Sequence, residues 1–184
     1  MKDLYQLPEG LPVPVDDGAC NHLEGAPFPS MLITVTPHAT YDFSKEKGIN
    51  IIFFYPMIGH PDSLPMTGWN EIPGARGCTP QALSYKNYFR QITKLGVRLF
   101  GASSQALKEQ NDAIDRLKLP FELINDSSFL LSNALKLPTF QFNEIKMIKR
   151  LTLVVVDGVI KKVFYPVFPP NKNVDDVIVW LKEN

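Results

Sequence analysis

Two apolar runs separated by a helical segment constrain the fold of this chain most strongly. Residues 49–56, INIIFFYP, and residues 97–103, VRLFGAS, are continuous apolar stretches of the kind found in strands buried on both faces. Between them, apolar residues recur every three or four positions over 79–95, which places them on one face of a helix. A second helical segment follows at 104–119. This alternation predicts parallel strands joined by right-handed helical crossovers.

The last third of the chain follows a different pattern. FELI at 121–124 reads as a third strand and 127–137 as a short helix. Two further apolar runs then flank Asp157-Gly158, a strong signal for a two-residue hairpin turn, and 174–184 has the period and charge distribution of a helix. We therefore predict an α/β protein with a thioredoxin-like fold: a mixed central sheet with flanking helices and a C-terminal β-hairpin plus helix.

The N-terminal segment is rich in proline, with six of the first forty residues. Proline cannot donate to a β-ladder, so we expect an extended arm over 1–40 packed on a domain formed by 41–184, a single domain overall. Within the arm, 31–37 predicts a short edge strand that ends at its proline. Residues 57–77 are broken by glycines and prolines and predict a long loop, and loops of this length in compact domains are usually functional.

Composition excludes several classes of function. The 184 residues suit one domain, and 19 basic against 19 acidic side chains leave no electrostatic footprint for nucleic acid or anionic membrane. No run approaches the roughly 20 apolar residues of a membrane span, and the N-terminus lacks the apolar stretch of a signal peptide, so we expect a cytoplasmic protein. Two cysteines and three scattered histidines do not make a zinc site or a disulfide framework, so we expect no metal and no cofactor.

Cys78 is the strongest candidate for chemistry. It stands in GCTPQ, directly before the predicted helix, with Thr79 placed as the cap and Pro80 at the first helical position. Unpaired N–H groups at a helix start favour an anion, and thiols in such places ionise at about pH 3.5 to 7.5. The alternative is that Cys78 is an inert, small apolar residue of the core.

Four segments carry a resemblance to a known family. FFYP, GCTPQ, GASSQALKEQNDAIDRLKLPFELIND and KRLTLVVVDGVI resemble, in order, the peroxiredoxins, especially the Q-type, over about residues 48–182. The resemblance implies a thioredoxin-fold thiol peroxidase in which Cys78 attacks the peroxide O–O bond and becomes a sulfenic acid. It also implies that Arg150, in KRLT, stabilises the thiolate and the developing oxyanion. Without the resemblance, Arg150 would be read as an ordinary surface charge.

The sequence departs from the family pattern before the cysteine. The family has threonine or serine three residues before it, where this chain has Ala75. Either Thr79 or backbone N–H groups hold the peroxide instead, with Gly77 as a supporting residue, or peroxide binding is weaker. The family proline corresponds to Pro56 if about fifteen residues are inserted before Cys78, or else Pro73 takes that role.

The resolving step is also unusual. Many Q-type members carry a resolving cysteine five residues after the first, where this chain has Leu83. Cys20 is the candidate resolving residue within the chain, and the alternative is that it is an incidental thiol. We expect a one-cysteine mechanism that uses an external reductant: thioredoxin, glutaredoxin or glutathione.

Two functions follow. The first is a thiol-dependent peroxidase that reduces hydrogen peroxide or organic hydroperoxides; the alternative is a peroxiredoxin-like redox-sensing or binding protein with little peroxidase activity. In the inserted loop, Trp69 with His60 and Met66 either walls an apolar pocket for an organic peroxide or, as we prefer, pins the loop to the core. The resemblance further implies a possible homodimer.

Overall fold

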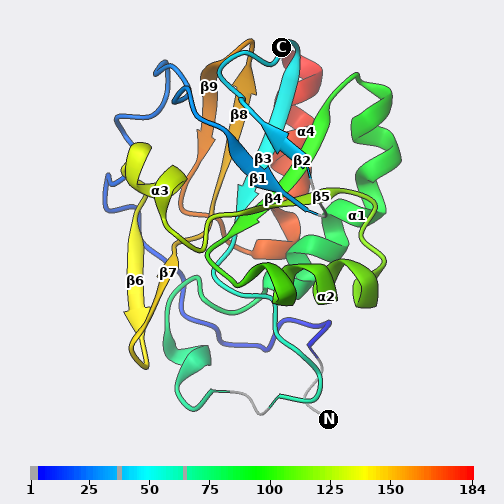
Figure 1. Cartoon of the computed structure of the whole chain (residues 1–184). Coiled ribbons are helices and arrows are strands. Elements are labelled where there is room, and N and C mark those ends of the chain that lie inside the picture. The colour runs from blue at the N-terminus through cyan, green and yellow to red at the C-terminus, as the bar shows by residue number, and fades with distance from the viewer. Residues whose placement is uncertain (1–3, 37–38, 64–65) are drawn as a thin grey trace.

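In a computed structural model that describes residues 4–36, 39–63 and 66–184, a seven-stranded sheet carries helices on its surface (Figure 1). The strands of this sheet are β1 (Ile33–Val35), β2 (Ala39–Tyr41), β3 (Ile49–Phe54), β4 (Arg98–Ser103), β5 (Glu122–Asn125), β8 (Leu151–Val156) and β9 (Val159–Phe164). A second, two-stranded sheet consists of β6 (Thr139–Phe142) and β7 (Ile145–Ile148). The helices are α1 (Cys78–Lys94), α2 (Leu107–Leu117), α3 (Leu130–Ala134) and α4 (Asn173–Glu183), with short 3-10 turns at Trp69–Glu71 and Pro170–Lys172.

The strand order β2-β1-β5-β4-β3-β8-β9 confirms the predicted mixed sheet. β3, β4 and β5 are parallel, whereas β8 runs antiparallel to β3 and forms a hairpin with β9. Asp157 and Gly158 both have positive φ in the turn of that hairpin, at 48° and 78°, as the two-residue signal requires. This is the predicted thioredoxin-like arrangement with a C-terminal hairpin plus helix.

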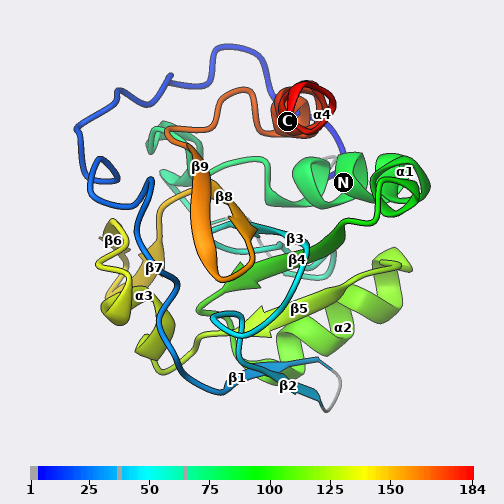
Figure 2. The same cartoon turned by 90° about the horizontal axis from the view of Figure 1, so that it is seen from above.

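The two faces of the sheet carry different layers. Alternate residues of β3 point to opposite sides, so that Phe53 packs in one buried cluster with side chains of α1, α2 and α4, and Ile52 packs in the other. Figure 2 shows α1 and α4 together on one side of the sheet. The opposite cluster is closed by α3 and by the N-terminal segment, through residues such as Leu23 and Phe28.

The N-terminal segment is paired to the sheet as well as packed on it. Its chain runs beside β9, where the Gly25 and Phe28 N–H groups donate to the carbonyls of Ile160 and Gly158, and the Ile160 N–H donates to Ala26. These bonds occupy polar groups that the edge of β9 would otherwise expose. The segment lies along the domain as expected for an arm, and the boundary at residue 40 stays a prediction.

Some details differ from the sequence-based expectation. The strand predicted over 31–37 is observed as β1, but its placement at the edge is wrong because β2 pairs outside it; Pro37, which was expected to end it, lies outside the described residues. The hairpin β6–β7 was not predicted. Among the described residues, no helix combines the length and apolar character needed to cross a membrane.

Candidate active site

Cys78 lies at the first position of α1, beyond the carboxyl end of β3. The helix begins at Cys78, two residues before the predicted first position at Pro80, and Gly77, not Thr79, is its cap residue. Gly77 has φ 108°, in the region that favours glycine, and a Cβ there would lie 2.6 Å from Leu7 Cδ2 and 2.8 Å from Pro170 Cγ. The glycine before the cysteine is therefore required both by the backbone turn and by the close approach of the arm and of the segment before α4.

The Cys78 sulfur is buried and surrounded by donors. Its side chain is 3% exposed, the backbone N–H of Met57 donates to Sγ at 3.4 Å, and Arg150 Nη2 donates at 3.2 Å. When protonated, the thiol can itself donate to the Ala75 carbonyl, 3.6 Å away. Two donors, one of them a cation, are therefore directed at one buried sulfur.

Arg150 is held by the loop that precedes the cysteine. Its Nε donates to the Gly74 carbonyl at 3.3 Å and its Nη2 donates to the Ala75 carbonyl at 3.1 Å, while Nη1 donates to Gln81 Oε1. The residue is only 3% exposed, so it is not an ordinary surface charge. Because guanidinium donates in a fixed planar fork, these acceptors fix the direction in which Nη2 points at the sulfur.

Of the supporting residues predicted from the sequence, two lie near the Cys78 sulfur and one lies near Arg150. Pro56 is buried directly before Met57, whose N–H bonds the sulfur, and Thr79 is 3% exposed beside Cys78 in the cavity that contains it. Pro73 is exposed and lines a different cavity, on the far side of Arg150. The structure thus brings Pro56 and Thr79 to the sulfur, and it brings Pro73 to the arginine.

Cys78 opens into a cavity of about 630 Å³. Leu4, Met57, Ile58, Met66 and Trp69 form its apolar part, and its charged part comes from Arg76 and from the α2 residues Lys108, Glu109, Asp112 and Arg116. His60 also lines it.

Trp69 both pins its loop and lines the cavity that contains Cys78. Its ring packs against Phe140 and Phe142 of β6, with centroids 6.2 and 5.7 Å away, and it also faces the cavity. The insertion is pinned to the β6–β7 hairpin and at the same time walls the space above Cys78.

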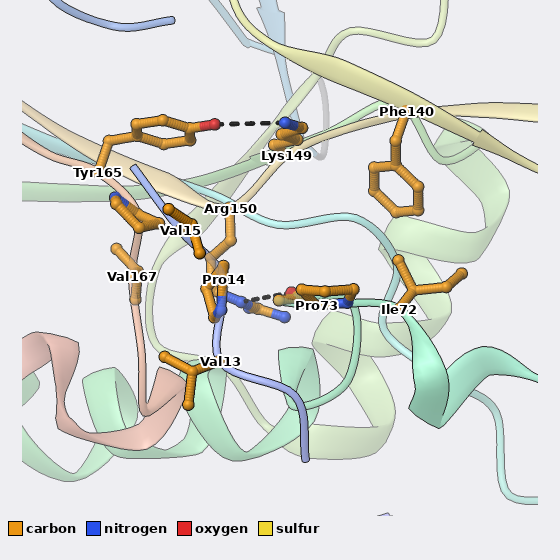
Figure 3. Close-up of a pocket in the computed structure, with 12 residues that line it drawn as sticks. Val13, Pro14, Val15, Ile72, Pro73, Phe140, Lys149, Arg150, Tyr165 and Val167 are labelled. Carbon is orange, nitrogen blue, oxygen red and sulfur yellow. Dashed lines mark hydrogen bonds between the residues drawn. The ribbon is translucent and has the colours of Figure 1, made fainter. Parts of the chain in front are cut away.

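A second cavity of about 330 Å³ lies on the other side of Arg150 (Figure 3). Val13 and Pro14 of the arm line it together with Pro73 and Phe140. At its rim, Lys149 donates to the Tyr165 hydroxyl at 3.4 Å and to Asp17 at 2.7 Å. Hydrogen bonds from Lys149 and then Tyr165 lower the pKa of Asp17 to about 2. The charges of this rim are therefore paired with one another.

Cys20 lies on the opposite face of the sheet from Cys78. It is 4% exposed in the cluster with Leu23 and Phe28, whereas Cys78 belongs to the cluster with Phe53. Burial, and then the nearby carboxylates of Asp17 and Asp16, raise the pKa of the Cys20 thiol to about 12. The structure does not bring the two cysteines together, and at neutral pH Cys20 is a protonated thiol.

The sequence did not indicate the roles of three site groups. The Met57 N–H is a backbone donor without a sequence signal, whereas the side chains of Gln81 and Asn173 are polar, buried and linked to Arg150. Gln81 lies near the start of α1 and Asn173 at the start of α4, so only the fold shows that the two side chains meet. Throughout the described part of the chain, His, Cys, Asp and Glu side chains do not gather in threes as a metal site would require.

A thioredoxin-like fold with a buried cysteine at a helix start, beside an arginine and a backbone N–H, defines a thiol-based oxidoreductase. The Redoxin family model matches residues 23–178, and the chain belongs to this family. Among curated relatives, the chloroplastic peroxiredoxin Q of Sedum lineare is 26% identical over 141 residues, covering 76% of this chain and 67% of the relative. The chloroplastic peroxiredoxin Q of Suaeda salsa is 24% identical over 161 residues, covering 86% of this chain and 67% of the relative.

Solved structures share the fold. Peroxiredoxin Q of Xanthomonas campestris superposes with a TM-score of 0.67 at 17% identity, covering 94% of this chain and 96% of the other. The peroxidoxin BcpB of Mycobacterium tuberculosis gives a TM-score of 0.70 at 16% identity, covering 88% of this chain and 97% of the other. The Xanthomonas campestris bacterioferritin comigratory protein, described with alkyl peroxide reduction activity, gives a TM-score of 0.70 at 17% identity. The match covers 88% of this chain and 96% of the other. The predicted peroxiredoxin-like family and fold are confirmed, and the class of enzyme is that of the thiol peroxidases.

Proposed function

We propose that Cys78 is the peroxidatic residue of this thiol peroxidase. The Cys78 thiolate attacks the terminal oxygen of a hydroperoxide ROOH, the O–O bond breaks, and the products are Cys78 sulfenic acid and the alkoxide RO⁻, which takes up a proton to leave as ROH. The observation that carries the proposal is the approach of Arg150 Nη2 to Sγ at 3.2 Å in a buried site. A cation there stabilises both the attacking thiolate and the negative charge that develops on the peroxide oxygens.

The residues around the sulfur complete the proposed site. Ala75 offers no hydroxyl for the peroxide, so Thr79, which faces the same cavity, and the N–H groups of the first turn of α1 take that task. Pro56 places the Met57 N–H at the sulfur, Gly77 permits the turn into the helix, and Pro73 supports the loop whose carbonyls hold Arg150.

Recycling needs an external thiol under this proposal. A first thiol R′SH condenses with the sulfenic acid to give a Cys78–S–S–R′ disulfide and water, and a second R′SH reduces it to Cys78 and R′SSR′. The support is that Cys20 lies across the sheet from Cys78 and that Leu83 occupies the place of the Q-type resolving cysteine. Thioredoxin, glutaredoxin and glutathione are the candidate reductants, and a resolving role for Cys20 would require the arm to leave its place.

The cavity supports organic hydroperoxides as substrates beside hydrogen peroxide. Its volume of about 630 Å³ lies within the range of pockets for small organic ligands, and Met57, Met66 and Trp69 provide apolar surface close to Cys78. The alkyl peroxide activity described for the Xanthomonas campestris bacterioferritin comigratory protein, which shares the fold, is consistent with this choice.

The cytoplasm is the proposed compartment, and a homodimer is the proposed assembly. The cytoplasm is supported by two cysteines that do not form a disulfide in this structure, while the curated plant relatives are named chloroplastic. A homodimer is supported by the family resemblance, and sedimentation of the purified protein tests it.

Rapid chemical quench tests the proposed function. Reduced protein is mixed with one equivalent of hydrogen peroxide or cumene hydroperoxide, with and without dimedone as a sulfenic acid trap, and peptides are mapped by mass. We expect trapping at Cys78 within seconds, no trapping in Cys78→Ser, and unchanged trapping in Cys20→Ser. Reaction no faster than that of a small-molecule thiol would overturn the peroxidase proposal and favour the sensing or binding alternative.

A further inference from the structure

Asn173, the first residue of α4, gathers three hydrogen bonds on one atom. Its Oδ1 accepts from the hydroxyls of Tyr85 and Thr152, each at 2.7 Å, and from Gln81 Nε2 at 3.1 Å. The donors come from two elements far apart in sequence, α1 and β8. Asn173 therefore ties the start of the last helix to the helix that carries Cys78.

The network around Asn173 has one fixed direction. Arg150 can only donate, so its Nη1 requires the oxygen of the Gln81 amide. The nitrogen of the same amide then points away and needs an acceptor, and Asn173 Oδ1 is that acceptor. If the Gln81 amide were turned over, its N–H₂ would face the guanidinium, so two donors would meet and both bonds would be lost.

Burial makes this link necessary. Gln81, Tyr85 and Thr152 are fully buried, and Asn173 is 1% exposed. Water therefore has no access to replace the Asn173 oxygen as the partner of Gln81, and an unpaired amide in this place costs free energy. The same oxygen also holds two hydroxyls, so its position does not depend on Gln81 alone.

We propose that Asn173 is a positioning residue for the peroxidase reaction: it fixes the Gln81 amide so that Arg150 presents Nη2 to the Cys78 sulfur. This inference rests on the proposed function of Cys78 and Arg150. Asn173 does not touch the reacting atoms; it acts through Gln81 on the arginine. The guanidinium also donates to the carbonyls of Gly74, Ala75 and Arg76, the last at 3.4 Å.

The Asn173→Ala variant tests the inference through two readouts. The rate of peroxide-dependent oxidation of Cys78 at pH 7 falls about tenfold, because the Gln81 amide is no longer held in the orientation that bonds the charged Arg150. The pH profile of the same rate also changes, which a loss of packing alone would not cause. Thr152→Val is the matched control, because it removes one donor from the same oxygen and leaves the bond between Asn173 and Gln81 in place. It lowers the denaturation midpoint but leaves both readouts within about twofold of the original.

A double-mutant cycle with Gln81→Glu separates positioning from packing. Both oxygens of the introduced carboxylate accept, so this side chain bonds Arg150 in either orientation. It has no N–H for Asn173 Oδ1, so the bond between positions 81 and 173 is already absent in this background. Adding Asn173→Ala to Gln81→Glu therefore changes the rate less than about threefold. If Asn173→Ala slows Cys78 oxidation tenfold both in the original protein and in Gln81→Glu, the inference is refuted. It is also refuted if Asn173→Ala does not slow oxidation in the original protein. If Asn173→Ala does not fold, Asn173→Ser keeps a polar atom in place, cannot reach all three donors, and carries the same expectation.

Arg150→Met distinguishes this inference from the proposed function. If Arg150→Met slows oxidation and Asn173→Ala does not, only the positioning role fails. If neither variant affects Cys78, the proposed role of Arg150 fails as well.

Discussion

Replacing Arg150 by methionine removes the cation at the sulfur while keeping an unbranched, apolar side chain. Unit charges 3.2 Å apart, the separation of Nη2 and Sγ, attract by about 5 kcal/mol at an effective dielectric constant of about 20, and hydrogen bonds to charged groups contribute about 1.5–3 kcal/mol in mutational series. We take the lower figure, because the Met57 N–H still donates to the sulfur in the variant. A loss of about 1.5–3 kcal/mol slows peroxide attack by about 13- to 160-fold.

The assay is rapid quench of the reduced protein with hydrogen peroxide at pH 7, with Cys78 oxidation quantified by peptide mass. Lys149→Met is the matched control: it removes the same charge from the neighbouring residue, whose ammonium bonds Asp17 and Tyr165. We expect the control to react within about threefold of the original rate. A folded Arg150→Met protein that oxidises as fast as Lys149→Met would refute the role of the cation.

Four further outcomes are expected. Gly77→Ala lowers the free energy of unfolding in urea by about 1–3 kcal/mol, because φ 108° is strained for alanine and its Cβ meets Leu7. Trp69→Ala lowers kcat/KM for cumene hydroperoxide about tenfold relative to hydrogen peroxide, since it removes apolar cavity wall; equal losses for both substrates would contradict this. Cys20→Ser leaves turnover with an external thiol unchanged, and loss of turnover would restore Cys20 as a resolving residue. Because the pKa of Asp17 is lowered to about 2, its stabilising contribution is complete above about pH 4 and is lost as pH falls toward 2. The difference in urea midpoint between the original and Asp17→Asn should therefore shrink over that interval, and a constant difference would exclude this linkage.

The central elements were predictable because their signals are local. The strand at β3 is an unbroken apolar run, and Asp157-Gly158 fixes the β8–β9 hairpin by backbone conformation. The β6–β7 hairpin was missed because its strands are only four residues long and its turn, Asn143-Glu144, lacks glycine although both residues have positive φ. Its stability comes from Trp69 and its neighbours, which lie far away in sequence.

The site was predictable where one short motif carries it. GCTPQ indicated Cys78 at a helix start, but the approach of Leu7 and Pro170 to Gly77, which leaves no room for a side chain there, is seen only in the folded chain. The position of Arg150 came from a resemblance, since its acceptors are carbonyls of a loop about 75 residues earlier in the chain. Asn173 carried no signal at all, because a buried amide near the C-terminus has meaning only through its three partners.

The separation of the two cysteines by the sheet gives this protein two independent reporters. Cys20 is 4% exposed within a cluster that includes the arm, so an alkylating reagent reaches it only when that core opens. Cys78 lines a cavity of its own, and its labelling follows the condition of the site. Pulsed alkylation of both thiols in a single sample therefore separates loss of folding from loss of reactivity, without any introduced probe.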